Sequence, residues 1–186
     1  MHNLISQADL DKIYNKELRH LGKQGVENII KKTRLDKSLG RKKIFLSHSH
    51  LDKTIVQKIV LLFEKINIDL YIDWQDSDLP QKTNKKTATL IKHKIQNCDL
   101  FLFLATYYGL RSKWCNWELG IAYSIKQEEN LAILPIESKS GNWSGTEYLG
   151  LYPEMQINTS NLDKIDLEDI NIKTPKKTIT LRNWIS

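Results

Sequence analysis

A tryptophan and a glutamate lie four residues apart in the segment 112–120, which reads Ser-Lys-Trp-Cys-Asn-Trp-Glu-Leu-Gly. In a helix this spacing places Trp114 and Glu118 on one face, one turn apart. A carboxyl group beside an indole ring loses part of its hydration, which raises its pKa. Such a group suits work on a proton or on a developing positive charge. Glu118 is therefore the first candidate for chemistry, although a helix glutamate at a solvent edge beside core aromatics has the same spacing.

Further candidates follow the short apolar segments of the chain. In an open parallel sheet, ligands bind beyond the carboxyl ends of the strands, near the point where the strand order reverses. We expect the residues after each apolar segment to line that crevice, together with the start of the helix near Ser112. They are Ser47 and His48 after the first segment, Asp73 and Trp74 after the second, and Tyr107 after the third.

The elements that position these residues alternate between strand and helix. Apolar periodicity predicts strands at 44–46, 68–72, 99–104 and 131–135, and helices at 51–66, 87–96 and 112–127. The run 99–104 is continuously apolar, as in a central strand buried on both faces. The alternation predicts an α/β fold: a flavodoxin-like open, mainly parallel sheet with helices on both faces. Residues 73–82 and 136–160 are expected to be loops, followed by a strand within 165–172 and a closing helix over 176–185.

The first forty residues show helical periodicity instead. Ser6 and Asp9 form a helix start of the capping-box type, and Gly22 is a stop. A second short helix is expected around Val26 to Ile30. We predict an N-terminal helical extension over residues 1–40 and the α/β domain over residues 41–186.

The composition narrows the classes of partner. The net charge is +6, but the lysines are scattered in pairs and are not interleaved with aromatic residues, so no nucleic-acid partner is expected. The apolar runs are far shorter than the ~20 residues of a membrane helix, and polar residues interrupt the first ten positions, so we expect no secretory signal. We therefore expect no membrane partner and a cytoplasmic location. Cys98 and Cys115 lack metal-ligand spacing, so we interpret them as reduced packing residues and expect no metal.

Four segments over about residues 42–136 resemble, in this order, the Toll/interleukin-1 receptor (TIR) domain family in its bacterial stand-alone form. Residues 45–49 with Asp52 resemble the first-strand motif, and residues 71–82 resemble the second strand and its BB loop. Residues 98–104 resemble the third strand. Residues 107–120 resemble the segment that carries the catalytic glutamate of the family, and this match is the most specific.

The resemblance implies an enzyme that cleaves the nicotinamide–ribose bond of NAD+, with Glu118 as the catalytic carboxylate. NAD+ is then a substrate, and no separate cofactor is needed. The implied substrate-binding residues are Ser47, His48, Asp73, Trp74, Tyr107 and Trp114. Trp114 fits a core anchor nearly as well, and His48 equally fits a solvated loop. Asp73 and Trp74 fit either a cover for the site or a contact with a second protomer.

The resemblance also implies self-association through TIR–TIR contacts. It further implies a role in antiphage defence, either by NAD depletion or through an ADP-ribose-derived signal that a downstream effector senses. Two other functions stay open: a TIR scaffold that acts only by homotypic association, and a nucleoside deoxyribosyltransferase-like hydrolase, which also uses a glutamate. A phosphoacceptor domain needs an aspartate at the end of the third strand, where residues 104–106 are Leu-Ala-Thr. Phosphate-binding glycine motifs are absent, so redox use of NAD is not expected.

Overall fold

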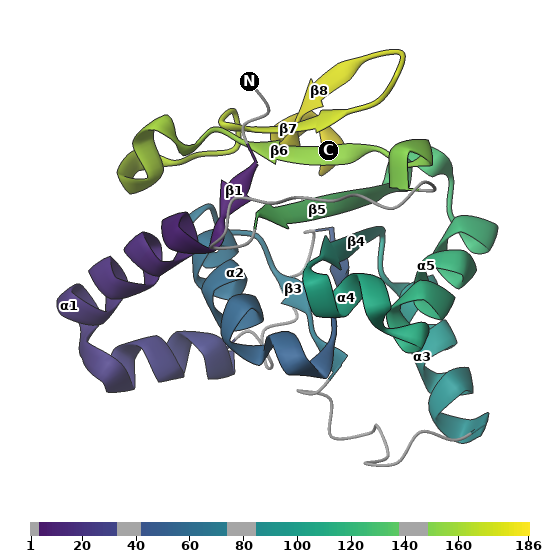
Figure 1. The fold of residues 1–186 in the computed structure, drawn as a ribbon, viewed down its shortest axis with the longest axis horizontal. Coiled ribbons are helices and arrows are strands. Elements are labelled where there is room, and N and C mark those ends of the chain that lie inside the picture. Colours follow the sequence, from purple (N-terminus) through teal and green to yellow (C-terminus); the bar gives the residue numbers. More distant parts are fainter. Residues whose placement is uncertain (1–3, 33–41, 74–84, 138–148) are drawn as a thin grey trace.

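The centre of the molecule is a mainly parallel sheet with helices on both faces (Figure 1). This computed structural model describes residues 4–32, 42–73, 85–137 and 149–186. Five strands run parallel in the order β3-β2-β4-β5-β6. Their bounds are β2 Ile44–Ser47, β3 Leu70–Tyr71, β4 Leu100–Ala105, β5 Leu131–Glu137 and β6 Glu154–Ile157. This is the predicted flavodoxin-like order, and its switch point lies between β2 and β4.

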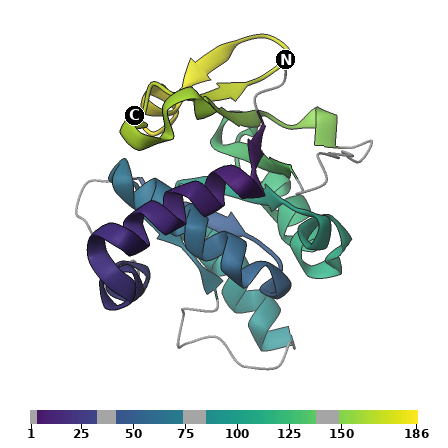
Figure 2. The same ribbon diagram turned by 60° about the vertical axis from the view of Figure 1, so that its left-hand side comes forward.

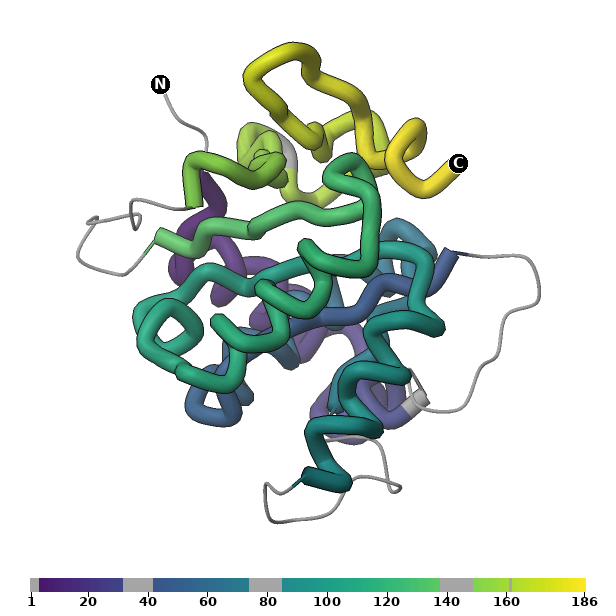
Figure 3. The backbone as a smooth tube through the Cα atoms, turned by 90° about the vertical axis from the view of Figure 1, so that its right-hand side faces the viewer, coloured from purple at the N-terminus to yellow at the C-terminus, as the bar shows by residue number. Residues whose placement is uncertain are grey.

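The strands present alternate residues to two apolar layers. Phe45, Phe101 and Phe103 face α3 (Lys85–Asn97) and α5 (Lys113–Ile125), whereas Leu46 and Leu102 face α2 (Lys53–Lys65). Figure 3 shows α3 and α5 in front of the sheet and the N-terminal helix behind it. All six residues of β4 are fully buried, which confirms the prediction of a central strand. The side chain of Ser47 therefore lies on the α5 face, because it has the same parity as Phe45.

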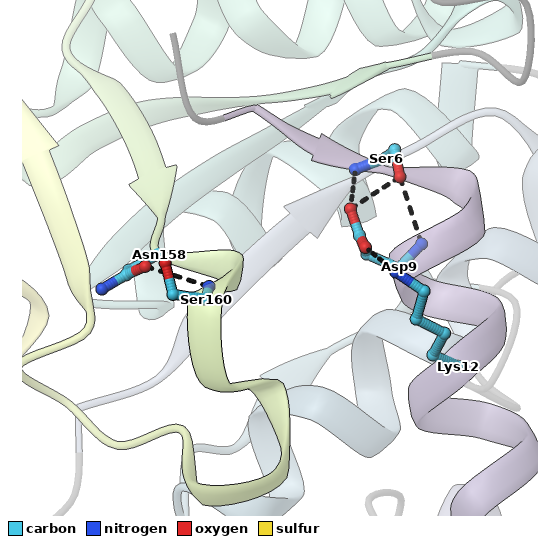
Figure 4. A network of polar contacts seen from close by, with 5 residues as sticks. All are labelled: Ser6, Asp9, Lys12, Asn158 and Ser160. Carbon is cyan, nitrogen blue, oxygen red and sulfur yellow. Dashed lines mark hydrogen bonds and ion pairs between the residues drawn. The ribbon is translucent and has the colours of Figure 1, made fainter. Parts of the chain in front are cut away.

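The N-terminal segment packs along α2 (Figure 2). Helix α1 (Gln7–Lys32) breaks at Gly22, which has a φ of 68° and a ψ of 171°, so the predicted stop and the second helical stretch are confirmed. The Ser6 amide donates to Asp9 Oδ2 at 3.3 Å, and the Asp9 amide donates to Ser6 Oγ at 3.1 Å (Figure 4). This reciprocal pair is the predicted capping box.

Two features of this segment are not apparent from its helical periodicity. Strand β1 (Ile5–Ser6) pairs in parallel with the end of β5. Lys58 and Lys65 of α2 form ion pairs with Asp11 and Glu17 of α1, the latter at 3.1 Å. The division into a 1–40 extension and a 41–186 domain stays a prediction.

The end of the chain differs from the expectation. Strand β6 lies within the predicted loop 136–160, and the closing helix predicted over 176–185 is wrong in its first half. In that half lies β8 (Thr178–Thr180), which forms an antiparallel hairpin with β7 (Ile170–Lys173). The short helix α6 (Leu181–Trp184) follows. Two of the three residues of β8 are threonines and the third is isoleucine, and such β-branched side chains favour strands. These strands are too short for their alternation to be distinctive.

Short helical segments complete the described residues. They are η1 His50–Asp52, α4 Tyr107–Arg111, η3 Glu128–Asn130, η4 Leu149–Leu151 and η5 Thr159–Lys164. Parts of the predicted loops 73–82 and 136–160, namely residues 74–82 and 138–148, lie outside the described residues. Across the described ranges, the helices are all too short or too polar to cross a membrane.

Candidate active site

Buried polar side chains gather where β2 and β4 end. Apart from Thr87, every buried polar or charged side chain within the described residues lies at or beside this end of the sheet. They are Ser47, His48, Ser49, Asp52, Thr106 and Glu118. Burial of polar groups is costly unless they are hydrogen-bonded, so such a cluster marks the candidate site at the switch point.

Glu118 is held at the centre of this cluster by α5. The helix begins at Ser112, whose hydroxyl accepts from the Cys115 amide at 3.2 Å. The buried face of α5 carries Cys115, Leu119 and Ala122, and Glu118 lies beside them with 2% of its surface exposed. Its Oε2 accepts a hydrogen bond from the Ser47 hydroxyl at 2.6 Å. The last residue of β2 is thereby joined to the helix that packs over it.

The surroundings of Glu118 change its acidity. Burial raises the pKa of its carboxyl from 4.5 to about 8, and the negative charge of Asp73 acts in the same direction. Hydrogen bonds from the side chains of Ser47 and Trp114 partly oppose this increase. Trp114 also stacks on Trp117, with ring centroids 4.8 Å apart. Near neutral pH the carboxyl is therefore largely protonated in this closed arrangement.

His48 and Asp73 join the ends of β2 and β3. The His48 Nδ1 lies 2.9 Å from the Leu46 carbonyl oxygen, and its Nε2 lies 3.3 Å from Asp73 Oδ1. The His48 side chain is 1% exposed and that of Asp73 is 28% exposed. The ring is thus enclosed in the protein instead of projecting into solvent. Trp74, predicted to lie beside it, is outside the described residues.

Tyr107 lies on the surface of α4, with 60% of its area exposed. The Arg111 guanidinium carbon is 3.8 Å from the centre of its ring, and Tyr108 packs against it edge-on. The structure thus brings Ser47, Trp114 and Glu118 together and pairs His48 with Asp73, whereas Tyr107 occupies the outer side of α4. Direct contact of these residues with a substrate stays a prediction.

A second buried carboxylate was missing from the predicted site. The Thr106 hydroxyl donates to Asp52 Oδ2 at 2.5 Å and accepts from the Gly109 amide at 2.9 Å, so it caps α4. Burial raises the pKa of the Asp52 carboxyl. A Cβ on Gly109 would lie 2.5 Å from the Leu104 carbonyl oxygen, so α4 sits directly on the end of β4. One signal in the sequence marked this residue, the place of Asp52 in the first-strand motif of the family resemblance, but no spacing connects Asp52 with Thr106.

The two cysteines lie in the interior of the protein. Both are buried and unpaired, which confirms the packing interpretation. Burial raises the pKa of the Cys98 thiol to about 11 and that of the Cys115 thiol to about 12, so both stay protonated. Within the described ranges, no group of three or more His, Cys, Asp or Glu residues could hold a metal ion.

Comparison with known proteins bears directly on this site. The family model of the TIR domain matches residues 44–172, from the first strand of the parallel sheet to β7. The chain belongs to the TIR domain family. The resemblance drawn from the sequence motifs is therefore confirmed, and the match includes all the candidate residues described above.

Two named relatives of this TIR domain come from bacteria. A Bacillus cereus (strain MSX-D12) protein named probable 3′ cyclic ADP-D-ribose synthase ThsB′ is 35% identical over 147 residues. The match covers 76% of this chain and 74% of that protein. A Cytobacillus dafuensis protein named putative cyclic ADP-D-ribose synthase TIR2 is 33% identical over 85 residues, which are 44% of this chain and 22% of that protein.

Proposed function

We propose that this TIR domain cleaves the nicotinamide–ribose bond of NAD+, with Glu118 as the catalytic carboxylate. The observation that carries the proposal is the buried Glu118 carboxyl, bound by Ser47 at the switch point of the sheet. The names of the two relatives, both cyclic ADP-D-ribose synthases, support NAD+ as the substrate.

The main contribution of the protein to this reaction is a negative charge near the ribose. Nicotinamide is cationic in NAD+ and takes the bonding electron pair when it leaves, so it needs no general acid. The ribose carbon then develops oxocarbenium character. A nearby carboxylate can stabilise this positive charge directly, or it can orient the ribose by binding its hydroxyls. In this proposal the ionised form of Glu118 does this work, and the Ser47 hydroxyl stabilises that form through its hydrogen bond.

The nucleophile that replaces nicotinamide decides the product. Water gives ADP-ribose, whereas a hydroxyl of the same ADP-ribose gives a cyclic product; in both cases the nucleophile loses one proton. We propose the cyclic product, as the names of both relatives suggest. A cyclic nucleotide suits a diffusible signal for a separate effector in antiphage defence.

Access to Glu118 requires a rearrangement. With 2% of the residue exposed, the carboxyl meets a ribose only after its neighbours move. We propose that self-association through TIR–TIR contacts opens or completes the site. An increase in turnover that is steeper than proportional to protein concentration would support this part of the proposal.

Product analysis tests the proposed function. The protein is incubated with NAD+ in water enriched in ¹⁸O, over a range of protein concentrations. The products are then separated and their masses are measured by mass spectrometry. We expect nicotinamide and a product without ¹⁸O whose mass equals that of NAD+ minus nicotinamide. ADP-ribose that contains ¹⁸O would show a hydrolase instead of a cyclase. No turnover at any concentration would favour the scaffold, and cleavage of nucleosides instead of NAD+ would favour the deoxyribosyltransferase-like enzyme.

Ser47→Ala should lower NAD+ cleavage about 10-fold at pH 7, since a hydrogen bond to a charged group contributes about 1.5–3 kcal/mol. In the wild type this hydrogen bond lowers the pKa of Glu118, so the pKa of Glu118 is higher in the variant. The loss of NAD+ cleavage should therefore become smaller as the pH increases. The measurement is the pH dependence of turnover. Ser124→Ala, on the exposed side of α5, is the matched control and should change nothing. An equal loss at every pH would contradict this role of Ser47.

A further inference from the structure

We propose that Asp52 is a positioning residue that acts through Thr106. The hydrogen bond between them keeps the Ser47 hydroxyl within bonding distance of the Glu118 carboxyl. The importance of Asp52 for turnover rests on the proposed function. The coupling between the two hydrogen bonds is independent of any substrate and can be measured on the protein alone.

Asp52 does not have the role that its position in the chain predicts. It directly precedes α2, where an aspartate usually accepts a hydrogen bond from a backbone amide of the first helical turn. The Asp52 side chain makes no such bond to α2. Its Oδ2 instead accepts from the hydroxyl of Thr106, which follows β4 and lies 54 positions along the chain. The carboxyl therefore joins two distant elements instead of capping its own helix.

Two buried hydrogen bonds join the same two stretches of the chain. The first joins Ser47 to Glu118 at 2.6 Å, and the second joins Asp52 to Thr106 at 2.5 Å. All four residues are at most 2% exposed, so water does not compete for either bond. The two stretches that these residues delimit are therefore bonded to each other at both ends, and together they form a closed ring.

The stretch from Ser47 to Asp52 is short and is bonded within itself. The Ser49 hydroxyl accepts from the backbone amide two residues later at 3.3 Å, and the Ser49 carbonyl oxygen accepts from the Asp52 amide at 2.9 Å. Only His48 separates Ser47 from this turn. A displacement of Asp52 is therefore transmitted to Ser47 instead of being absorbed between them.

The stretch from Thr106 to Glu118 is a corner made of α4 and the first turns of α5. The Ser112 amide donates to the Gly109 carbonyl oxygen at 3.2 Å. The Asn116 side-chain amide donates to two carbonyl oxygens at the junction of the helices, at 3.0 and 2.9 Å. Because these bonds tie the end of α4 to α5, the corner moves as one unit, with a partner for the other stretch at each end.

Asp52 thus influences Glu118 without contacting the substrate. Loss of its bond opens the ring and lets the two stretches move apart, which weakens the Ser47–Glu118 bond although neither of these residues is changed. That bond stabilises the ionised form of Glu118, which the proposed chemistry uses. Burial raises the pKa of the Asp52 carboxyl, so the protein keeps this group inside at a cost in stability, as is common for groups retained for function.

A double-mutant cycle on turnover tests the proposal. Asp52→Ala should lower NAD+ cleavage about 10-fold, as Ser47→Ala does, because it weakens the same hydrogen bond indirectly. The double variant should also lose about 10-fold, since without the Ser47 hydroxyl there is no bond left for Asp52 to maintain. Two independent losses would instead multiply to about 100-fold, and this result would overturn the proposal.

Conservative variants separate the hydrogen bond from the charge and from general damage to the fold. Asp52→Asn retains a group that can bond to Thr106 and should keep nearly wild-type turnover; a loss as large as that of Asp52→Ala would contradict the proposal. Thr106→Ser should also be close to the wild type. Thr106→Val retains the shape but not the hydroxyl, so it replaces Asp52→Ala in the cycles if that variant does not fold. Asn158→Ala removes a cap of η5 outside the ring and is the control, with unchanged turnover.

Urea unfolding repeats the cycle without substrate. Asp52→Ala and Ser47→Ala should each lower the unfolding midpoint, and the double variant should lose no more than about the larger of the two single losses. The control Asn158→Ala should add its own loss in full to that of Ser47→Ala. Fully additive losses for Asp52→Ala and Ser47→Ala would overturn the proposal, whatever happens to turnover. A wild type that does not cleave NAD+ but shows the expected midpoints would contradict only the proposed function.

Discussion

Glu118→Gln should lower NAD+ cleavage by about 10²- to 10³-fold, the usual effect of removing one electrostatic stabiliser of a transition state. Glutamine retains the shape of the side chain and an oxygen that accepts from Ser47, so the fold should be preserved. Only the charge that stabilises the oxocarbenium ion is lost. Nicotinamide release measures the effect, and circular dichroism checks the fold. Glu128→Gln, at an exposed position shortly after α5, should retain wild-type turnover. Persistent cleavage in Glu118→Gln would remove Glu118 from the mechanism.

The same substitution should stabilise the protein at high pH. In the folded state the pKa of Glu118 is about 8, against an ordinary value of 4.5. Below pH 4.5 both states hold the proton, so Glu118 has no effect on stability. As the pH rises from 4.5 to about 8, the unfolded state ionises first and the wild type loses stability. Above that range the loss is complete, on the order of 5 kcal/mol.

Glutamine does not ionise, so the free energy of unfolding of Glu118→Gln should exceed that of the wild type by an amount that grows between pH 5 and pH 8. Urea unfolding at the two pH values measures this difference. A difference that is the same at both values would mean that the wild-type carboxyl is already ionised when folded. A variant that gains stability while it loses activity is the behaviour expected of a functional group kept in an unfavourable environment.

The centre of the parallel core could be predicted because its strands β2, β4 and β5 are buried almost throughout. Residues 99–104 and 131–135 are continuous apolar runs, and the helices between them have a clear period. The predicted end of the first strand and the predicted start of the helix near Ser112 were enough to place Ser47 and Glu118 near one crevice. Their mutual hydrogen bond joins residues 71 positions apart and depends on how α5 sits on β2, which no local pattern encodes.

Other parts of the fold depend on contacts that leave almost no local signal. Strand β1 has two residues, and only its pairing with the end of β5 makes it a strand. Asp52 lies in a three-residue turn, and its burial follows from the position of Thr106 at the end of β4. A carboxylate in a polar segment normally indicates exposure, so its role in holding α4 is visible only in three dimensions.

The free energy of unfolding can show whether the N-terminal helix is an appendage or part of the core. Leu10 is fully buried and packs in the same apolar cluster as α2 and one face of the sheet. Truncation of such a leucine costs about 2–5 kcal/mol, so Leu10→Ala should strongly destabilise the whole molecule. Leu21, on the same helix but 40% exposed, is the matched control, and Leu21→Ala should cost less than about 1 kcal/mol.

Tryptophan fluorescence during urea unfolding separates the two possibilities, because all five tryptophans lie at residues 74–184, beyond the N-terminal segment. If α1 unfolds as one cooperative unit with the sheet, Leu10→Ala lowers the fluorescence midpoint by the full cost of the cavity. If α1 is an independent extension, it frays first and the fluorescence midpoint does not move. The burial of Leu10 and the ion pairs of Lys58 and Lys65 with α1 favour the first result. The helix predicted as an extension would then belong to the cooperative unit that holds Glu118 in its buried position.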